Sequence, residues 1–295
     1  RAGWLLLAVL ATWEGLWLID HHRYEWSFAL GVLGLAAGWL RYHLREREQP
    51  NAGKVSLWAM LWGLAFWLGS GWSYIDYRLS ADTHLASGLG LVAASCVLFE
   101  ICGGWLRWGA LRRAQVLLLP VMALAVLMQF ERHLHPAAGG AGPAWLAAFA
   151  AFYSILYRQH KAGIGVGANA QHVVAVWFAV GLLAWELAWQ SAQLDPGTSW
   201  PFALWGAVPA LTLLLIAHFG RMAWPWRENF EYFRNGCLTP IALYCVLWSF
   251  ASSWDSGRSG PWPYLPLLNP IDLAQIGVLC GLRAWLRAGG QRLSA

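Results

Sequence analysis

Apolar residues in this chain gather in runs of roughly 17 to 25 residues, separated by short polar stretches. A helix needs about 20 residues to cross the hydrocarbon core of a bilayer, which is about 30 Å thick. The pattern therefore predicts an all-α fold, a polytopic integral membrane helical bundle of about ten transmembrane helices. Their expected ranges are 3–20, 26–43, 55–75, 84–107, 114–131, 143–158, 171–191, 200–219, 237–253 and 270–287.

Consecutive helices are expected to pair as five hairpins, at 3–43, 55–107, 114–158, 171–219 and 237–287, within one transmembrane domain over 1–295. The loops that close the hairpins hold Arg23, Arg78, Arg132 and Arg258. The loops and ends between hairpins hold many more basic residues, namely Arg41, Arg45, Arg47, Lys54, Arg107, Arg112, Arg113, Arg158, Lys161, Arg221, Arg227, Arg234, Arg283, Arg287 and Arg292. Because cytoplasmic loops are enriched in Lys and Arg, both termini are predicted to be cytoplasmic and the hairpin tips external.

The composition agrees with a membrane protein, since 58% of residues are hydrophobic and only 12% are charged. The net charge of +5 is spread over short loops, so no nucleic-acid partner is expected. The five Cys lie within apolar runs without a C-x-x-C pair, which excludes a disulfide framework and argues against a thiolate metal site, and no cofactor is expected. The chain begins at Arg1 without Met, from which we expect it to be a fragment of a longer protein.

An internal repeat links two distant parts of the chain. Trp13-Glu14-Gly15-Leu16-Trp17 is matched by Trp185-Glu186-Leu187-Ala188-Trp189, and each copy is followed by Trp-x-Phe-Ala-Leu. A carboxylate inside a bilayer costs several kcal/mol unless it is paired, protonated or hydrated. Glu14 and Glu186 are therefore expected to point into the bundle, either as hydrogen-bonded structural groups or as a proton or substrate site.

A second group of candidates lies at the predicted external tips. We single out His21, His84 and His133 with Glu14 and Glu186 as candidate catalytic residues, because imidazoles and carboxylates transfer protons near neutral pH. The pairs His21-His22 and His133-x-His135 are also of a type that ligates metal, and the further alternative is that these His residues are only solvated loop residues. Glu100 and His218, near the inner helix ends, are expected to reach the lipid headgroups.

The segment Pro266-Leu267-Leu268-Asn269-Pro270-Ile271-Asp272 predicts the start of the last helix, with Asn269 as N-cap and Pro270 at the first helical position. Through this motif and its Trp-rich hairpins the chain resembles a large uncharacterised family of bacterial multi-pass inner-membrane proteins that carry a P-L-L-N-P-[LI]-D segment. The resemblance implies a bacterial cytoplasmic membrane and a longer parent chain. It implies no activity.

Three classes of function stay open at this point. The first is an enzyme or handler of a lipid-linked envelope substrate at an outward-facing intramembrane site, and the second is a proton-coupled transporter. The third is a non-catalytic scaffold for envelope assembly that packs other membrane subunits against its Trp-rich faces. The lipid bilayer is the partner that all three share.

Overall fold

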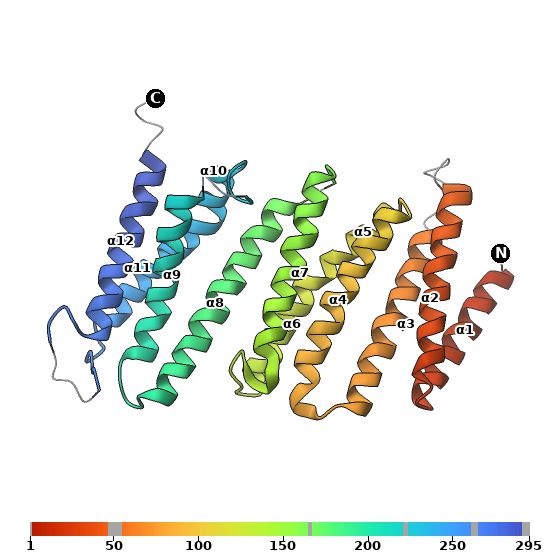
Figure 1. The fold of residues 1–295 in the computed structure, drawn as a ribbon, viewed down its shortest axis with the longest axis horizontal. Helices are drawn as coiled ribbons and strands as arrows, with labels where there is room; N and C mark the ends of the chain where they lie inside the picture. Colours follow the sequence, from red (N-terminus) through yellow and green to blue (C-terminus); the bar gives the residue numbers. More distant parts are fainter. Residues whose placement is uncertain (1, 47–54, 165–166, 221–223, 261–264, 291–295) are drawn as a thin grey trace. The chain divides into compact units, whose positions relative to one another are not determined.

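The computed structural model describes residues 2–46, 55–164, 167–220, 224–260 and 265–290, and these residues form helices and loops without a strand. The long helices in the described ranges are α1 (Ala2–Asp20), α2 (Tyr24–Arg41), α3 (Val55–Arg78), α4 (His84–Trp105), α6 (Leu118–Glu131), α7 (Ala141–Lys161), α8 (Ala168–Leu194), α9 (Trp200–Phe219), α11 (Thr239–Ser252) and α12 (Pro270–Gly290) (Figure 1). Short helical turns lie between them, namely α5 (Gly109–Arg112), α10 (Phe230–Phe233), the π-helical η1 (Tyr42–Glu46) and η5 (Arg234–Leu238), and the 3₁₀ turns η2 (Ala81–Thr83), η3 (Arg113–Leu117) and η4 (Ala138–Gly140). The all-α prediction is confirmed, and each predicted range overlaps one of the long helices.

Within the described residues, five helical stretches are long and apolar enough to cross a membrane, judged by length and composition: Ala81–Trp105, Gly109–Glu131, Ala138–Lys161, Ala168–Leu194 and Trp200–Phe219. Other helices also expose apolar faces. On α11, Leu243, Leu247 and Phe250 recur at spacings of four and three residues and are 59% to 65% exposed. A face of this kind is suited to lipid contact, so the multi-pass membrane character of the chain is supported.

The chain divides into two compact units by its internal contacts. The first unit contains residues 1–132 and 137–161, and the second contains residues 133–136 and 162–295. In the first unit the packing runs from α1 through α2, α3 and α4 to α7, with α6 also against α4. In the second unit α9 is central, because α8, α11 and α12 all pack against it.

The most extensive packing in the first unit joins α2 and α3, which belong to different predicted hairpins. Small residues explain this close approach. A Cβ on Gly63 would lie 2.7 Å from the Leu35 backbone nitrogen and 2.8 Å from the Gly31 carbonyl oxygen. At one end of the same interface, the Ser70 hydroxyl donates a 2.5 Å hydrogen bond to Ser27 Oγ, and both side chains are buried. Small residues and interhelical hydroxyl bonds are the usual means of packing helices where lipid removes the hydrophobic driving force.

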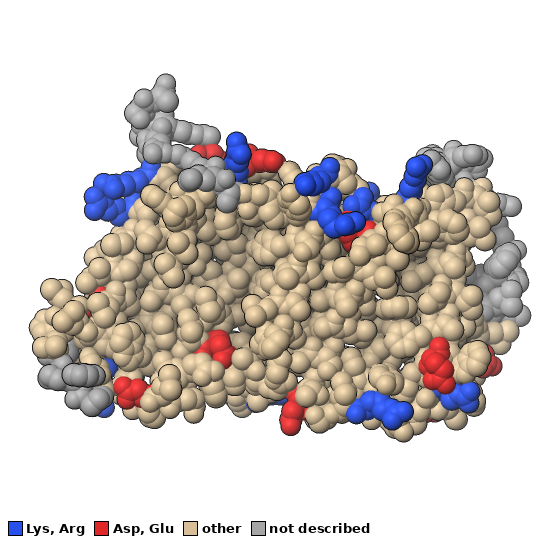
Figure 2. Space-filling model, viewed as in Figure 1, with Lys and Arg blue, Asp and Glu red and all other residues tan. Residues whose placement is uncertain are grey.

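Within each unit, Lys, Arg, Asp and Glu lie mostly at helix ends, and uncharged side chains cover most of the surface between them (Figure 2). The core of the second unit is apolar. It includes Leu213, Phe233, Leu238 and Val278, all fully buried. Few charged side chains of the described residues therefore lie away from the helix ends, and each of these is a candidate for a specific role.

Candidate functional site

Glu186 and His135 form a hydrogen-bonded acid–base pair in the second unit. Glu186 lies on α8, eight residues before the helix ends at Leu194, and His135 lies in the segment 133–136 that groups with this unit. His135 Nδ1 is 2.9 Å from Glu186 Oε2. The side chains are 17% and 20% exposed, so the pair is partly enclosed and still reachable. Because a carboxylate can only accept, Nδ1 carries the proton, and the lone pair of the neutral ring is on Nε2.

Two further residues of α8 hold this pair in place. Gln190 Nε2 donates a 2.7 Å hydrogen bond to Glu186 Oε1, so both carboxylate oxygens are hydrogen-bonded. The Trp189 indole stacks on the His135 ring, with centroids 3.6 Å apart and planes inclined by 7°. One turn of helix brings Glu186, Trp189 and Gln190 to the same region, since residues three and four apart share a face. The imidazole is thus fixed in position by a hydrogen bond and by a ring contact.

The sequence identifies Glu186 but does not single out its partner. His135 and His133 stand two residues apart in the same loop, and the pattern His-x-His alone does not distinguish them. In the structure His133 is exposed, with a left-handed backbone (φ 55°), and makes no hydrogen bond or ion pair with Glu186. Pro136 follows His135 directly and is buried, but the sequence alone carries no signal that selects His135 over His133.

Glu14, the other member of the repeat, has different surroundings, and the expectation that it points into the bundle is wrong. Its side chain is exposed and makes no hydrogen bond or ion pair with a described residue. The face of α1 that packs against α3 contains Thr12 and Gly15, which lie close to Glu14 in the sequence. Gly15 lies directly against the Phe66 ring, and the Thr12 hydroxyl oxygen accepts a 2.9 Å hydrogen bond from Trp62 Nε1. Glu14 is turned about 100° from Gly15 and so leaves that interface.

The remaining predicted His residues make local contacts in the first unit. His21 Nδ1 donates to the Trp17 carbonyl oxygen at 2.9 Å, and the two rings stack with centroids 4.0 Å apart. His84 Nε2 donates to the Leu79 carbonyl oxygen at 2.9 Å, and its Nδ1 lies 3.5 Å from Asp76 Oδ1. These contacts fix the ends of α1 and α4. Across the described ranges, no group of three or more His, Cys, Asp or Glu side chains is placed to hold a metal ion.

A buried polar cluster in the first unit was not predicted. Glu100 is only 1% exposed, so the expectation that it reaches the headgroups is wrong. Its Oε1 accepts from Arg112, with Nε at 3.0 Å and Nη2 also bonded, and its Oε2 accepts from Gln159 Nε2 at 3.0 Å. The Gln159 amide also donates to the Arg112 carbonyl oxygen at 2.9 Å. These bonds tie α4, α5 and α7 together, which indicates a structural role.

The motif before the last helix adopts the predicted cap. The Asp272 backbone N–H donates to Asn269 Oδ1 at 2.9 Å, and α12 begins at Pro270. Asp272 Oδ2 in turn accepts from Asn269 Nδ2 at 2.6 Å and from the Leu267 backbone N–H at 2.8 Å. The side chains of Asn269 and Asp272 therefore accept hydrogen bonds from backbone N–H groups of the turn and of the first turn of α12.

No curated protein and no solved structure matches the chain in a comparison with known proteins. A family model described as "Predicted membrane protein (DUF2339)" matches residues 2–294, which is nearly the whole sequence. With its helical fold and its apolar spans, the chain belongs to this family of predicted membrane proteins.

Proposed function

We propose that the long helices α1, α2, α3, α4, α6, α7, α8, α9, α11 and α12 all span a bacterial inner membrane, with both termini in the cytoplasm. The basic residues of the predicted inner loops support this orientation. The Glu186–His135 pair then lies in the outer half of the bilayer, towards the external ends of the helices.

The function we propose is the handling or transfer of a lipid-linked envelope substrate at this outward-facing site. The observation that carries the proposal is the hydrogen bond from His135 Nδ1 to Glu186 Oε2. A carboxylate that holds one imidazole nitrogen orients the ring and stabilises its protonated form, as a general base requires. His135 Nε2 would accept the proton of an attacking hydroxyl and return it to the leaving oxygen of the donor. Glu14, His21, His84 and His133 stay predicted candidates without a comparable geometry.

A cell-based assay tests the proposal with the full-length protein in the organism that encodes it. Envelope lipids and glycans are compared by mass spectrometry in cells that carry the parent, Glu186→Gln or His135→Asn in place of the chromosomal copy. Gln at 186 keeps a hydrogen-bond acceptor and removes the charge. Each variant is expected to reproduce the envelope change of a gene deletion, with a product at least about tenfold reduced, because one acid–base group contributes roughly 10²–10⁴-fold.

His218→Asn is the matched control, since His218 is exposed on α9 and its ring contacts only Phe219 among the described aromatic residues. This control is expected to retain the parent envelope. The amount and the melting temperature of each purified variant are measured to exclude misfolding. An unchanged envelope in well-folded Glu186→Gln cells would refute the proposal.

Proton-coupled transport is the second candidate, and the same pair favours it. Glu186 lies within a long apolar helix and shares a proton position with His135, which is how relay groups in transporters are built. Reconstituted vesicles distinguish the two functions, because a transporter gives solute flux that depends on a proton gradient and is lost in Glu186→Gln. If both the envelope and the flux are insensitive to the pair, a non-catalytic scaffold is the interpretation that is left.

A further inference from the structure

Two loops of the second unit are tied together by Ser199, which is 5% exposed. Its hydroxyl donates to Asp255 Oδ1, and its backbone N–H donates to the Arg258 carbonyl oxygen at 2.9 Å. The same Asp255 oxygen accepts from the Gly257 backbone N–H at 2.9 Å. Asp255 therefore joins the loop before α9 to the loop after α11, and its carboxylate is bonded to these two donors and not to the neighbouring Arg258 side chain.

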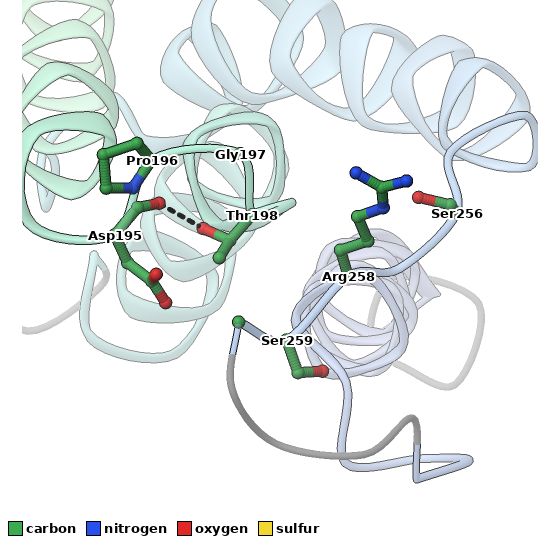
Figure 3. A pocket seen from close by; sticks show the side chains of 8 residues that line it. Asp195, Pro196, Gly197, Thr198, Ser256, Arg258 and Ser259 are labelled. Carbon is green, nitrogen blue, oxygen red and sulfur yellow. Dashed lines mark hydrogen bonds between the residues drawn. The ribbon is translucent and has the colours of Figure 1, made fainter.

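A polar hollow of about 470 Å³ lies between these two loops. The residues that give it its chemistry are Asp195, Thr198, Ser256, Arg258, Ser259 and Gly260 (Figure 3). The Thr198 hydroxyl donates to the Asp195 carbonyl oxygen at 2.9 Å, which fixes the turn that presents the Asp195 side chain. The hollow thus has a defined wall and one formal charge of each sign.

Among the described residues, these two charges, the Asp195 carboxylate and the Arg258 guanidinium, have no hydrogen-bond or ion-pair partner. Figure 3 shows the guanidinium on the side of Ser256 and the carboxylate on the side of Ser259, so the two groups point apart. The Gly260 backbone, at φ 79°, lies against the carboxylate, and any side chain at this position would collide with it. Asp195 is partly buried and Arg258 is exposed, so both residues line one hollow and their charges are open to a ligand.

We propose that this hollow binds a zwitterion that carries a primary ammonium and a phosphate, as in phosphoethanolamine. The ammonium would donate hydrogen bonds to Asp195, and the phosphate would accept from Arg258 and from the adjacent hydroxyl of Ser256. A ligand with only a negative charge would be repelled by Asp195, and a ligand with only a positive charge would be repelled by Arg258. Since the hollow is at the ends of the apolar helices α8, α9 and α11, the lipid form of this ligand is the headgroup of phosphatidylethanolamine. The inference concerns binding and does not depend on the Glu186–His135 chemistry.

Native mass spectrometry of the purified full-length protein tests the proposal. Delipidated protein is reloaded separately with phosphatidylethanolamine, phosphatidylglycerol or phosphatidylcholine of identical acyl chains. Phosphatidylglycerol lacks the cation, and phosphatidylcholine has a quaternary ammonium without N–H donors. Phosphatidylethanolamine is expected to bind about tenfold more tightly than either, which is the effect of one charge-assisted hydrogen bond.

Two variants assign the preference to the hollow. Asp195→Asn is expected to remove the preference for phosphatidylethanolamine over phosphatidylglycerol, and Arg258→Gln to weaken both by about tenfold. Both variants should fold, because the hydrogen bonds of these two residues with the described chain are made by their backbone atoms. Arg132→Gln and Asp82→Asn are the matched controls, because both residues are exposed and lie between long helices of the other unit.

Free phosphoethanolamine distinguishes the two sources of the ligand. If it displaces the lipid from the parent protein but not from Asp195→Asn, the hollow recognises the headgroup alone. If only the lipid binds, with the same dependence on Asp195 and Arg258, the acyl chains contribute to the site. Binding of all three lipids at equal strength in the parent and both variants would overturn the proposal.

Discussion

The Tyr244 hydroxyl donates a 3.1 Å hydrogen bond to the carbonyl oxygen of Trp205, the residue four positions before Pro209 in α9. Proline has no N–H, so the helix itself leaves this carbonyl without a donor. Tyr244 on α11 therefore satisfies a backbone group of a neighbouring helix. Such replacement is required where lipid offers no alternative partner.

Tyr244→Phe is expected to destabilise the protein by about 1 kcal/mol, the contribution of one hydrogen bond whose acceptor is left unpaired. In a Pro209→Ala background, Tyr244→Phe should cause a smaller loss of stability, because the introduced alanine supplies a helical N–H to the Trp205 carbonyl. Thermal unfolding in detergent measures all four members of this double-mutant cycle. Tyr232→Phe serves as the control, since the Tyr232 hydroxyl makes no hydrogen bond with a described residue. Equal losses in both backgrounds would contradict the proposed exchange of donors.

Arg112→Gln is expected to destabilise the first unit by about 3 kcal/mol, because it leaves the Glu100 carboxylate buried without its cation. The double variant Glu100→Gln/Arg112→Gln removes both charges and should recover part of this loss. Arg113→Gln, which changes the adjacent exposed Arg, should stay within about 0.5 kcal/mol of the parent. Chemical denaturation followed by Trp fluorescence gives these differences. A double variant that is less stable than Arg112→Gln alone would show that the charge is not the cause.

A methyl group added at two glycines of α3 should affect the stability of the first unit differently. Gly63→Ala places a Cβ within 2.8 Å of the α2 backbone and should separate α2 from α3, with a lower melting temperature. At Gly69 nothing lies within 4 Å of an added Cβ, so Gly69→Ala should be neutral or stabilise the helix by up to about 1 kcal/mol. If both variants melt at the same temperature, the close contact between α2 and α3 does not determine the stability of this unit.

The positions of the helices follow from the sequence, because the length of an apolar run is a local property. The predicted run 200–219 coincides with α9, and the run 114–131 differs from α6 only by the 3₁₀ turn η3 at its start. The cap at Asn269 was predictable for the same reason, since its donor and acceptor lie within three residues of each other. Local sequence patterns do not identify the contacts that a side chain makes with residues far away in the sequence.

The two copies of the Trp-Glu repeat illustrate this limit. Glu14 and Glu186 have similar neighbours in sequence, yet only Glu186 meets a His, which comes from a loop 51 residues away. Glu100 likewise depends on Gln159, 59 residues further on. The carboxylates could be identified from the sequence, but their surroundings depend on the tertiary packing.

The candidate site is expected to lie on the external side of the membrane. Arg132 follows α6 in a predicted external tip, whereas Arg158 lies in the last turn of α7 at the predicted cytoplasmic end. In a variant without the five native Cys, an impermeant maleimide should label Arg132→Cys in intact cells. Arg158→Cys should react only after the membrane is opened, because positively charged loops stay in the cytoplasm. The opposite labelling pattern would place Glu186 and His135 towards the cytoplasm, where an externally presented envelope substrate does not reach them. That result would exclude the proposed function, although the geometry of the pair would be unchanged.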